Sequence, residues 1–274
     1  MTQYILIGFL LLAIIWPLLR YLTFLISNWR AGSLPIISSR LGGLVRPILR
    51  GVVTAGVADL LVLPSYPLGI CGGREPMEDG TPVLLVHGLF HNSSAWLVMK
   101  RRLRAAGFRN VHTYQYNSFS RGFDEAVGGM QRKLDQLLRG RPGGKVLLVG
   151  HSLGGLVIRR AVGDPRYWDR VAGIVALGTP HGGSDLARFG TNAMARGLIP
   201  GHAIPVAADA APDAHCPKLA IYNLVDDFVF PLETLIPARP GWDEHVCSSM
   251  GHVWMLYSRE VAGLVVDFLR KNDV

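Results

Sequence analysis

Short apolar runs alternate with longer segments of mixed polarity from about residue 80 to the carboxyl end of the chain. The apolar runs are rich in β-branched and aliphatic residues, which is typical of strands buried on both faces of a sheet. They predict strands at 81–88, 110–117, 144–152, 171–179 and 218–225. The segments between and after them predict helices at 94–107, 123–139, 153–162 and 259–271. Because strands and helices alternate, we expect an α/β protein with a mainly parallel sheet and helices on both of its faces.

The front of the chain has a different pattern. Residues 4–19 carry no charge, and the apolar character continues to Ile26 with Arg20 as its single charged residue. This length is enough for a membrane-spanning helix if the Arg20 side chain snorkels toward the lipid head groups. A cleaved signal peptide fits less well, because no basic residue precedes the run and no small-x-small site follows it. We therefore predict a transmembrane anchor over residues 1–30, with a purely soluble helix as the alternative.

Residues 41–61 predict a second helix, because their apolar positions recur at steps of three and four while Arg46 and Arg50 share another face. Pro47 is expected to divide this helix into two shorter pieces. The helix either lies in a membrane interface or packs on the α/β domain. We place an amphipathic and linker region at 31–74, followed by the α/β domain at 75–274. The linker is marked by Pro64, Pro67, Gly69, Gly72 and Gly73.

Composition narrows the class of protein. The chain has 274 residues, of which 49% are hydrophobic and 18% charged, so it forms an ordered globular domain rather than a disordered one. Its formal net charge is +8, and half of that excess lies in residues 1–70, where five arginines face a single aspartate. A basic cluster beside an apolar run favours anionic lipid head groups. No zinc-finger spacing, aromatic RNA motif or lysine tract is present, and no nucleic acid partner is expected.

The five arginines also predict an orientation for the anchor. All of them follow the start of the apolar run and none precedes it. The positive-inside rule then places the amino terminus outside and the α/β domain on the cytoplasmic face. The three cysteines leave the redox compartment open, because a Cys216–Cys247 bridge and free thiols at Cys71, Cys216 and Cys247 both fit an odd number at wide spacing.

The segment Gly150-His151-Ser152-Leu153-Gly154 stands between a predicted buried strand and a predicted helix. A sharp strand-to-helix turn holds a serine in a strained conformation and leaves no room for side chains two positions away on either side. Gly150 and Gly154 meet that requirement. We therefore predict that Ser152 is a nucleophile at the amino end of a helix, where negative charge is favoured.

Acyl transfer also needs two backbone N–H groups directed at the developing oxyanion. Leu153, the residue after the nucleophile, is expected to supply one, and the loop after an earlier strand the other. His87-Gly88-Leu89-Phe90 ends the strand that begins at Thr81, and Leu89 is our candidate for the second N–H. Gly88 lets the loop backbone come close, and His87 is expected to be structural.

An acid and a histidine follow the serine in the order that a catalytic triad of this kind requires. Asp226 and Asp227 stand at the end of a predicted strand, and His252 lies 26 residues beyond Asp226, just before the last helix. An imidazole with a pKa near neutrality can take the serine proton, and a carboxylate orients that imidazole. Neighbouring side chains project oppositely from an extended chain. We assign the acid to Asp226, which follows the strand directly, and expect Asp227 to face solvent or to cap the next turn.

These motifs resemble those of bacterial lipases and esterases of the α/β-hydrolase superfamily. The resemblance covers about residues 80–270 and rests on VHGLF, GHSLGG, the GTPHGGS segment at 178–184, the D-x-x-V-x-P stretch that begins at Asp226, and the terminal Gly251-His252. It implies the α/β-hydrolase fold, a structural role for His181 and a lid or cap at about 184–217. It also implies a bacterial protein, whose anchor would lie in the inner membrane. No pair of carboxylates matches the calcium site that some secreted lipases carry, so neither a metal nor a cofactor is expected.

The predicted function is a membrane-associated serine hydrolase that cleaves carboxylic esters, with an ester or lipid substrate and an acyl-enzyme on Ser152. Thioester cleavage and acyl transfer use the same triad and stay open as alternatives. A fold that has lost catalysis and binds a lipid or a protein partner is a third reading, but intact Ser152, Asp226 and His252 argue against it. The apolar residues between Ser184 and Pro217 either line an acyl pocket or cover the edge of the sheet.

Overall fold

The computed structural model describes the backbone of residues 2–70 and 75–274, and the side chains of residues 13–70 and 75–274. Its centre is a sheet of six strands in the order β2-β1-β3-β4-β5-β6, and every neighbouring pair is parallel. The strands are β1 Val83–Val86, β2 Val111–Tyr114, β3 Val146–His151, β4 Val171–Leu177, β5 Lys218–Tyr222 and β6 Trp242–Val246. The predicted parallel sheet is confirmed.

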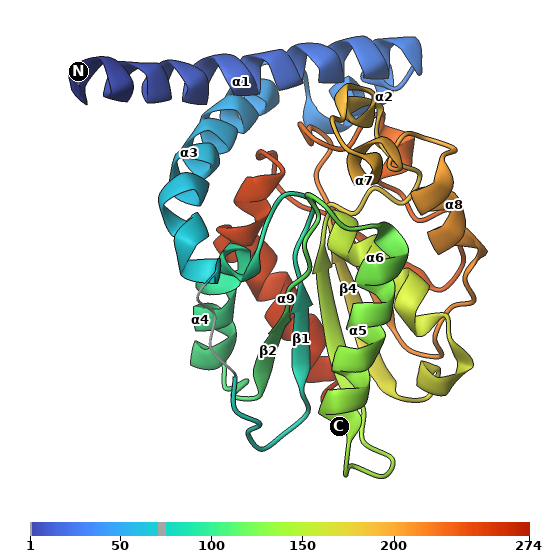
Figure 1. Cartoon of the computed structure of the whole chain (residues 1–274). Helices are drawn as coiled ribbons and strands as arrows, with labels where there is room; N and C mark the ends of the chain where they lie inside the picture. Colours follow the sequence, from blue (N-terminus) through green and yellow to red (C-terminus); the bar gives the residue numbers. More distant parts are fainter. Residues whose placement is uncertain (1, 71–74) are drawn as a thin grey trace.

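Helices cover both faces of this sheet, as the alternating pattern predicted (Figure 1). Side chains along β1 show why its run is apolar throughout. Leu84 and Val86 pack on the side of α5 and α6, whereas Val83 and Leu85 pack on the side of α4 and α9. These helices are α4 Leu97–Ala105, α5 Phe123–Leu138, α6 Leu153–Val162 and α9 Arg259–Lys271. The helices α6 and α9 begin and end at the predicted residues.

The sixth strand, β6, was not predicted. Its sequence Trp242-Asp243-Glu244-His245-Val246 has three polar residues in a row, and the side chains of those three residues are exposed. β6 pairs only with β5 and forms the edge of the sheet, so its residues lack the burial that produces a recognisable apolar run.

Three helices precede the sheet: α1 Thr2–Arg30, α2 Leu34–Leu41 and α3 Val45–Ile70. The expected break at Pro47 is wrong, because Pro47 is the third residue of α3 and lies in the first turn, where its missing N–H costs no helical hydrogen bond. The linker expected from Pro64 to Gly69 is also helical.

The last turns of α3 are held by the loop after β1. Asn92 Nδ2 donates to the Tyr66 carbonyl at 2.9 Å, and Ser93 Oγ donates to the Gly69 carbonyl at 3.1 Å. These donors satisfy carbonyls that have no partner at a helix end. The predicted linker residues Gly72 and Gly73 lie outside the described residues.

The carboxyl half of α1 packs into the loops that follow β5. Tyr21 and Phe24 are buried in one cluster with Leu224, Val225 and Phe230. The Tyr21 hydroxyl donates to the Val225 carbonyl at 3.0 Å, and the Leu232 N–H donates to Asn28 Oδ1 at 2.9 Å. This half of the predicted anchor is therefore part of the core of the domain that contains the sheet.

The sequence predicts that Arg20 snorkels toward lipid head groups, and the structure shows that it does not. Its side chain is 2% exposed and pairs with two carboxylates inside the protein. Among the described residues, α3 is the helix long and apolar enough to cross a membrane by length and composition, which is weak evidence for a span. The side chains of residues 1–12 lie outside the described residues, so a spanning segment at the front of the chain stays a prediction.

Candidate active site

Ser152 occupies the sharp turn between β3 and α6. Its backbone has φ 55° and ψ −128°, a conformation that side chains other than glycine rarely adopt. A Cβ atom on Gly150 would lie 2.6 Å from the Gly155 nitrogen, and one on Gly154 would lie 2.2 Å from the Val86 carbonyl oxygen. Both distances are too short for real atoms, so the turn requires glycine at the two positions that flank the serine.

His252 and Asp226 form a hydrogen-bonded pair. His252 Nδ1 lies 2.8 Å from Asp226 Oδ2, and both side chains are buried. The second carboxylate oxygen, Asp226 Oδ1, accepts the N–H groups of Phe228 and Val229, each at 2.9 Å. These bonds hold the carboxylate in one orientation and place the Nδ1 proton of the imidazole toward it. Within the described part of the chain, His252 Nε2 has no hydrogen-bond partner, and it can accept a proton.

Ser152 and His252 line a common cavity of about 230 Å³. Most of the other side chains around it are apolar and come from the loop after β1, from α1 and from the predicted lid. The apolar lining includes Trp16, Leu89, Leu186, Phe189, Leu198 and Phe228. The cavity therefore joins a serine and a histidine to a surface that suits an apolar group. Sequence reasoning missed Trp16 as a lining residue, because the contact depends on how α1 crosses the molecule.

The predicted lid consists of short helical segments: a 3₁₀ segment at Asp185–Phe189, then α7 Ala193–Arg196 and α8 Ala203–Ala210. Leu186, Phe189 and Leu198 face the cavity, whereas Met194 and Ile204 belong to the core against the sheet. The sequence left open whether the apolar residues of this segment line a pocket or cover the sheet, and the structure shows that some do each.

The loop after β1 passes directly beside Ser152. A Cβ on Gly88 would lie 2.8 Å from the Ser152 Cβ, so the close approach requires glycine. Leu89 lines the cavity, while the N–H of the next residue, Phe90, is already donated to Ser118 Oγ at 2.7 Å. Leu153 is the first residue of α6, and N–H groups in a first helical turn have no acceptor within the helix. Leu153 thus follows Ser152 directly in the chain, and Leu89 follows the glycine that lies against the Ser152 Cβ.

The expectation that Asp227 faces solvent is wrong. Asp227 is fully buried, because the chain after β5 turns instead of continuing as an extended strand. Its Oδ1 accepts the His252 N–H at 2.7 Å, and its Oδ2 lies 2.8 Å from Arg20 Nε. Burial raises the pKa of the Asp227 carboxyl, and the positive charge of Arg20 acts in the opposite direction.

Arg20 connects α1 to the histidine through several contacts. Its Nη2 lies 2.8 Å from Asp59 Oδ2 on α3, and its guanidinium carbon lies 4.5 Å from the ring centre of Phe228. The Phe228 ring in turn stacks on His252, with 5.2 Å between the ring centres. One feature of the sequence indicates this arrangement: Arg20 and Asp59 each stand as a single charge in an apolar stretch.

Replacing Arg20 with methionine is expected to lower the free energy of unfolding by about 3–5 kcal/mol, because it leaves the buried Asp227 carboxylate without its partner. Urea unfolding followed by circular dichroism measures this change. In the double variant Arg20→Met with Asp227→Asn, much of the loss should be recovered, since the fully buried carboxylate is then neutral and only Asp59, whose side chain is 24% exposed, loses its partner. Parental stability in the single variant would show that the ion pair contributes nothing.

Three other histidines near the serine, His87, His151 and His181, have contacts within the protein. His87 Nδ1 donates to the Gly88 carbonyl at 2.8 Å, its Nε2 accepts the Tyr116 N–H at 3.2 Å, and its ring stacks on Tyr116. Burial lowers the pKa of His87 to about 4. Burial also holds the pKa of His151 and of His181 well below the usual range. His181 lies 3.0 Å from Arg159 Nη1. At neutral pH these three imidazoles are therefore uncharged, and they pack against other groups inside the protein. These contacts agree with the structural roles expected for His87 and His181.

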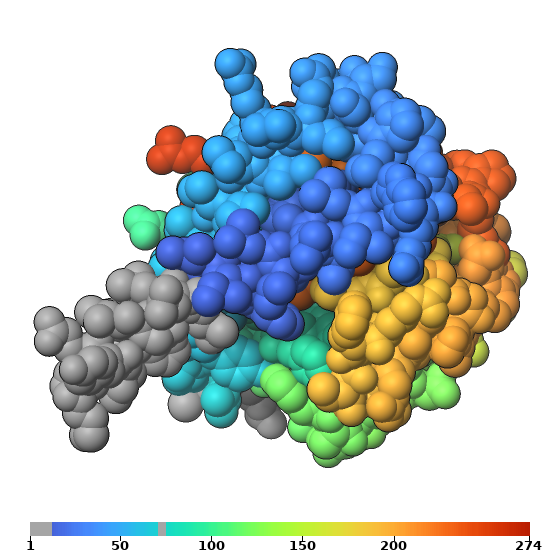
Figure 2. All heavy atoms as spheres, turned by 90° about the horizontal axis from the view of Figure 1, so that it is seen from above, coloured from blue at the N-terminus to red at the C-terminus, as the bar shows by residue number. Residues whose placement is uncertain are grey.

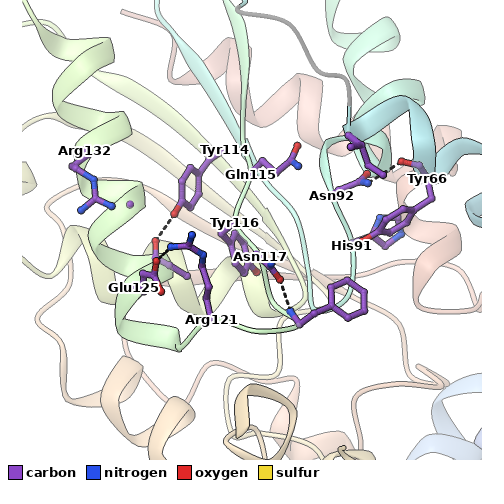
Figure 3. Close-up of a pocket in the computed structure, with 14 residues that line it drawn as sticks. Tyr66, His91, Asn92, Tyr114, Gln115, Tyr116, Asn117, Arg121, Glu125 and Arg132 are labelled. Atoms are coloured by element: carbon purple, nitrogen blue, oxygen red, sulfur yellow. Dashed lines mark hydrogen bonds and ion pairs between the residues drawn. The ribbon is translucent and has the colours of Figure 1, made fainter. Parts of the chain in front are cut away.

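A second hollow, of about 740 Å³, lies between α5 and the end of α3 (Figure 3). It is larger than the serine cavity, but none of Ser152, Asp226 and His252 lines it. Its polar side chains largely bond within the protein, as Arg121 does with Glu125 and the Tyr114 hydroxyl with the Ala126 carbonyl. We therefore place the candidate active site in the smaller cavity, where the reactive groups converge.

Cys216 and Cys247 are free thiols, so the possible bridge between them is not formed. Cys71 lies outside the described residues. Among the side chains that the structure describes, no group of three or more His, Cys, Asp or Glu residues is placed to hold a metal ion.

Comparison with known proteins agrees with this fold. The model of the alpha/beta hydrolase family matches residues 83–215, which include β1, the Ser152 turn and β4. The probable esterase PIR7A of rice, Oryza sativa subsp. indica, is 37% identical over 108 residues. That match covers 37% of this chain and 40% of the rice protein, so the chain matches less than half the length of this relative.

Two solved structures illustrate the likeness. The mature form of the Bacillus licheniformis lipase BlEst2 superposes with a TM-score of 0.58 and 18% identity, covering 74% of this chain and 96% of the lipase. A monoacylglycerol lipase of Paleococcus ferrophilus gives a TM-score of 0.53 and 20% identity, covering 70% of this chain and 96% of that protein. The chain thus has the α/β-hydrolase fold. Since the matched proteins come from rice and from two microbes, a bacterial origin stays a prediction.

Proposed function

We propose that the protein is a carboxylic ester hydrolase in which Ser152 is the nucleophile, His252 the general base and Asp226 the residue that orients the imidazole. The observation that carries the proposal is the bond of 2.8 Å between His252 Nδ1 and Asp226 Oδ2, in a cavity that His252 shares with Ser152. The esterase and lipases to which the chain is similar support the same chemistry.

The groups present account for each step of ester cleavage. Ser152 Oγ attacks the ester carbonyl carbon while His252 Nε2 takes the hydroxyl proton. The carbonyl π electrons move to oxygen, where the backbone N–H groups of Leu89 and Leu153 stabilise the negative charge. Collapse of this intermediate expels the alcohol, which leaves with the proton from His252, and an acyl-enzyme remains on Ser152. A water molecule then repeats the sequence, releasing the acid and restoring the serine.

The lining of the cavity favours an apolar acyl group. Side chains from the lid and from α1 surround the serine, and the other polar side chains that line the cavity are those of His91, His151, Ser184 and His252. An acyl chain would bury apolar surface in this cavity, which is favourable in proportion to the area removed from water. We therefore propose lipid or other acyl esters as the substrate class. Thioesters and other acyl acceptors share the acyl-enzyme and are discriminated by a substrate panel.

A fluorophosphonate probe is expected to label the full-length protein covalently on Ser152, as shown by mass spectrometry of the labelled peptide. Ser152→Ala should abolish labelling, because the probe reacts with an activated serine hydroxyl. Ser120→Ala is the matched control, since Ser120 is exposed and does not line the cavity. Absence of labelling in the parent protein would refute the proposal and favour a fold that only binds its ligand. A labelled protein that hydrolyses thioesters but no oxygen esters would refute the substrate class.

A further inference from the structure

The exposed apolar side chains of this protein are concentrated on its first three helices. Eighteen of the 24 exposed large hydrophobic residues among the described side chains lie between residues 14 and 70. They are Ile14, Ile15, Trp16, Leu18, Leu19, Leu22, Ile26, Trp29, Ile36, Val45, Leu49, Val53, Val57, Leu60, Leu61, Leu63, Leu68 and Ile70. A soluble monomer rarely exposes so much apolar surface in one region.

We propose that the outer faces of α1, α2 and α3 form one surface that binds in the plane of an anionic lipid bilayer, with the Ser152 cavity opening at that surface. The second part rests on the proposed function, because it presents the ester cavity to lipid. We call these outer faces the lipid-binding surface.

The packing of α3 argues for binding in the plane rather than for a span. Its inner face touches the rest of the protein along most of its length. A Cβ on Gly51 would overlap the Tyr21 ring, one on Gly56 would lie 2.5 Å from the Ala13 carbonyl oxygen, and one on Gly69 would overlap the Asn92 side chain. These contacts extend over about 27 Å of helix at 1.5 Å per residue.

The same face of α3 also bonds to the active-site region. The Gly251 N–H, next to His252, donates to Thr54 Oγ1 at 2.8 Å. A spanning helix must be surrounded by hydrocarbon over roughly 30 Å. From Thr54 to Gly69, about 22 Å at 1.5 Å per residue, α3 contacts the catalytic domain, and at Gly51 and Gly56 it contacts α1. It therefore cannot cross a bilayer without carrying polar strands and loops into the hydrocarbon, where unsatisfied backbone groups are costly. Its free face can instead lie in the interface.

Charge identifies the surface as one for anionic lipid. Between residues 13 and 70 the single acidic residue is Asp59, and it is paired with the buried Arg20. Arg30, Arg40, Arg46 and Arg50 are exposed, and no carboxylate among the described residues lies within salt-bridge distance of them. The surface therefore combines apolar side chains with uncompensated positive charge. A membrane that contains anionic lipids is complementary to both properties.

The cavity reaches this surface at its rim. Trp16 on α1 and Phe189 in the lid both line the cavity, and their side chains are 47% and 71% exposed. Seen from above, α1 crosses this face of the molecule between the helices that follow it and the gold segment that includes the lid (Figure 2). An acyl chain could therefore pass from lipid into the cavity between apolar side chains without entering water, which defines the substrate as an ester held in a bilayer.

Binding to vesicles of stated composition tests the proposal. The full-length Ser152→Ala protein, added from a dilute detergent stock, is expected to float with vesicles of 70% phosphatidylcholine and 30% phosphatidylglycerol. Arg46→Glu with Arg50→Glu should weaken this binding at least tenfold, because the attraction to anionic head groups is removed. Arg101→Glu with Arg104→Glu is the matched control, since these arginines are exposed on α4, away from α1 (Figure 1), and binding should be unchanged. Equal binding to pure phosphatidylcholine would overturn the assignment to anionic lipid.

Thiol labelling from outside sealed vesicles tests whether α3 lies in the plane of the membrane or spans it. In a background without Cys71, Cys216 and Cys247, single cysteines at Val45→Cys and Leu68→Cys mark the two ends of α3. An impermeant maleimide outside sealed vesicles should label both to within about twofold. Protection of one end until the vesicles are opened would establish a span and overturn the in-plane arrangement. A protein that ignores vesicles but dimerises would assign the surface to a second copy of the chain, which also overturns it.

Failure of this proposal is distinguishable from failure of the ester hydrolase function. Arg46→Glu with Arg50→Glu touches neither Ser152 nor its cavity, so hydrolysis of a short soluble ester should stay within twofold of the parent. A parent protein that hydrolyses the soluble ester but does not bind vesicles would overturn only the lipid-binding surface. Vesicle binding without any esterase activity would overturn only the function.

Discussion

Replacing Ser152 with alanine is expected to reduce turnover on a soluble p-nitrophenyl ester by about 10⁶, the cost of losing the nucleophile in a comparable triad. The Ser152 hydroxyl is our candidate for acyl transfer, because Ser152, in its turn at φ 55°, lines the same cavity as His252. Alanine keeps the Cβ and therefore the packing against Gly88, so the fold should be unaffected.

The measurement is a steady-state assay of the full-length protein with an equal amount of Ser120→Ala protein as the control. Circular dichroism should give the same spectrum for the parent and both variants, which separates lost chemistry from lost structure. A Ser152→Ala protein, free of contaminating esterase, that retained more than about 1% of the parental turnover would exclude Ser152 as the nucleophile.

Asp226→Asn is expected to lower turnover by about 10⁴ by selecting the wrong histidine tautomer. The structure explains which way the amide would turn. The Phe228 and Val229 N–H groups need an acceptor at Oδ1, so the amide oxygen takes that place and the amide NH₂ points at His252 Nδ1. Nδ1 must then accept a hydrogen bond, which puts the imidazole proton on Nε2, where it blocks proton transfer from Ser152.

Asp227→Asn is the matched control, and its expected effect has a different origin. Asparagine can still accept the His252 N–H, but it removes the negative charge that faces Arg20. We expect a lower unfolding temperature and a turnover within about tenfold of the parent when both are assayed well below that temperature. If Asp227→Asn instead costs about 10⁴ and Asp226→Asn is mild, the acid is Asp227 and the assignment must move by one residue.

The elements that the sequence predicted accurately are those with strong local patterns. The boundary between β3 and α6 is defined by a run of aliphatic residues followed by two glycines around a serine, and these features need no distant partner. His252 could be selected from nine histidines because chain order and the following helix restrict the choice. Leu89 lines the cavity, and its N–H as a donor to the oxyanion stays a prediction.

The features that could not be predicted depend on contacts between distant residues. An arginine in an apolar run is compatible with a membrane helix or with a buried ion pair, and its partner Asp227 lies more than 200 positions later. The same holds for the roles of the two aspartates. Alternation in an extended chain predicted that Asp227 points away from the site, whereas a turn after β5 directs both carboxylates inward. Pro64 and Pro67 predicted a linker, whereas the chain there is helical. The hydrogen-bond donors that hold this end of α3, Asn92 and Ser93, come from a distant loop and leave no sign in the local sequence.

The docking of α1 has a consequence for the order in which the protein is made. Tyr21 and Asn28 bond to Val225 and Leu232, which follow them by 204 residues in each case. At about 5–20 residues per second, α1 leaves the ribosome roughly 10–40 s before those partners exist. During that interval only the neighbouring helices α2 and α3 of its own chain can cover its apolar side chains, and the proposed lipid-binding surface would let a bilayer cover the rest. The last segment to be synthesised then completes the site against a helix that is already in place.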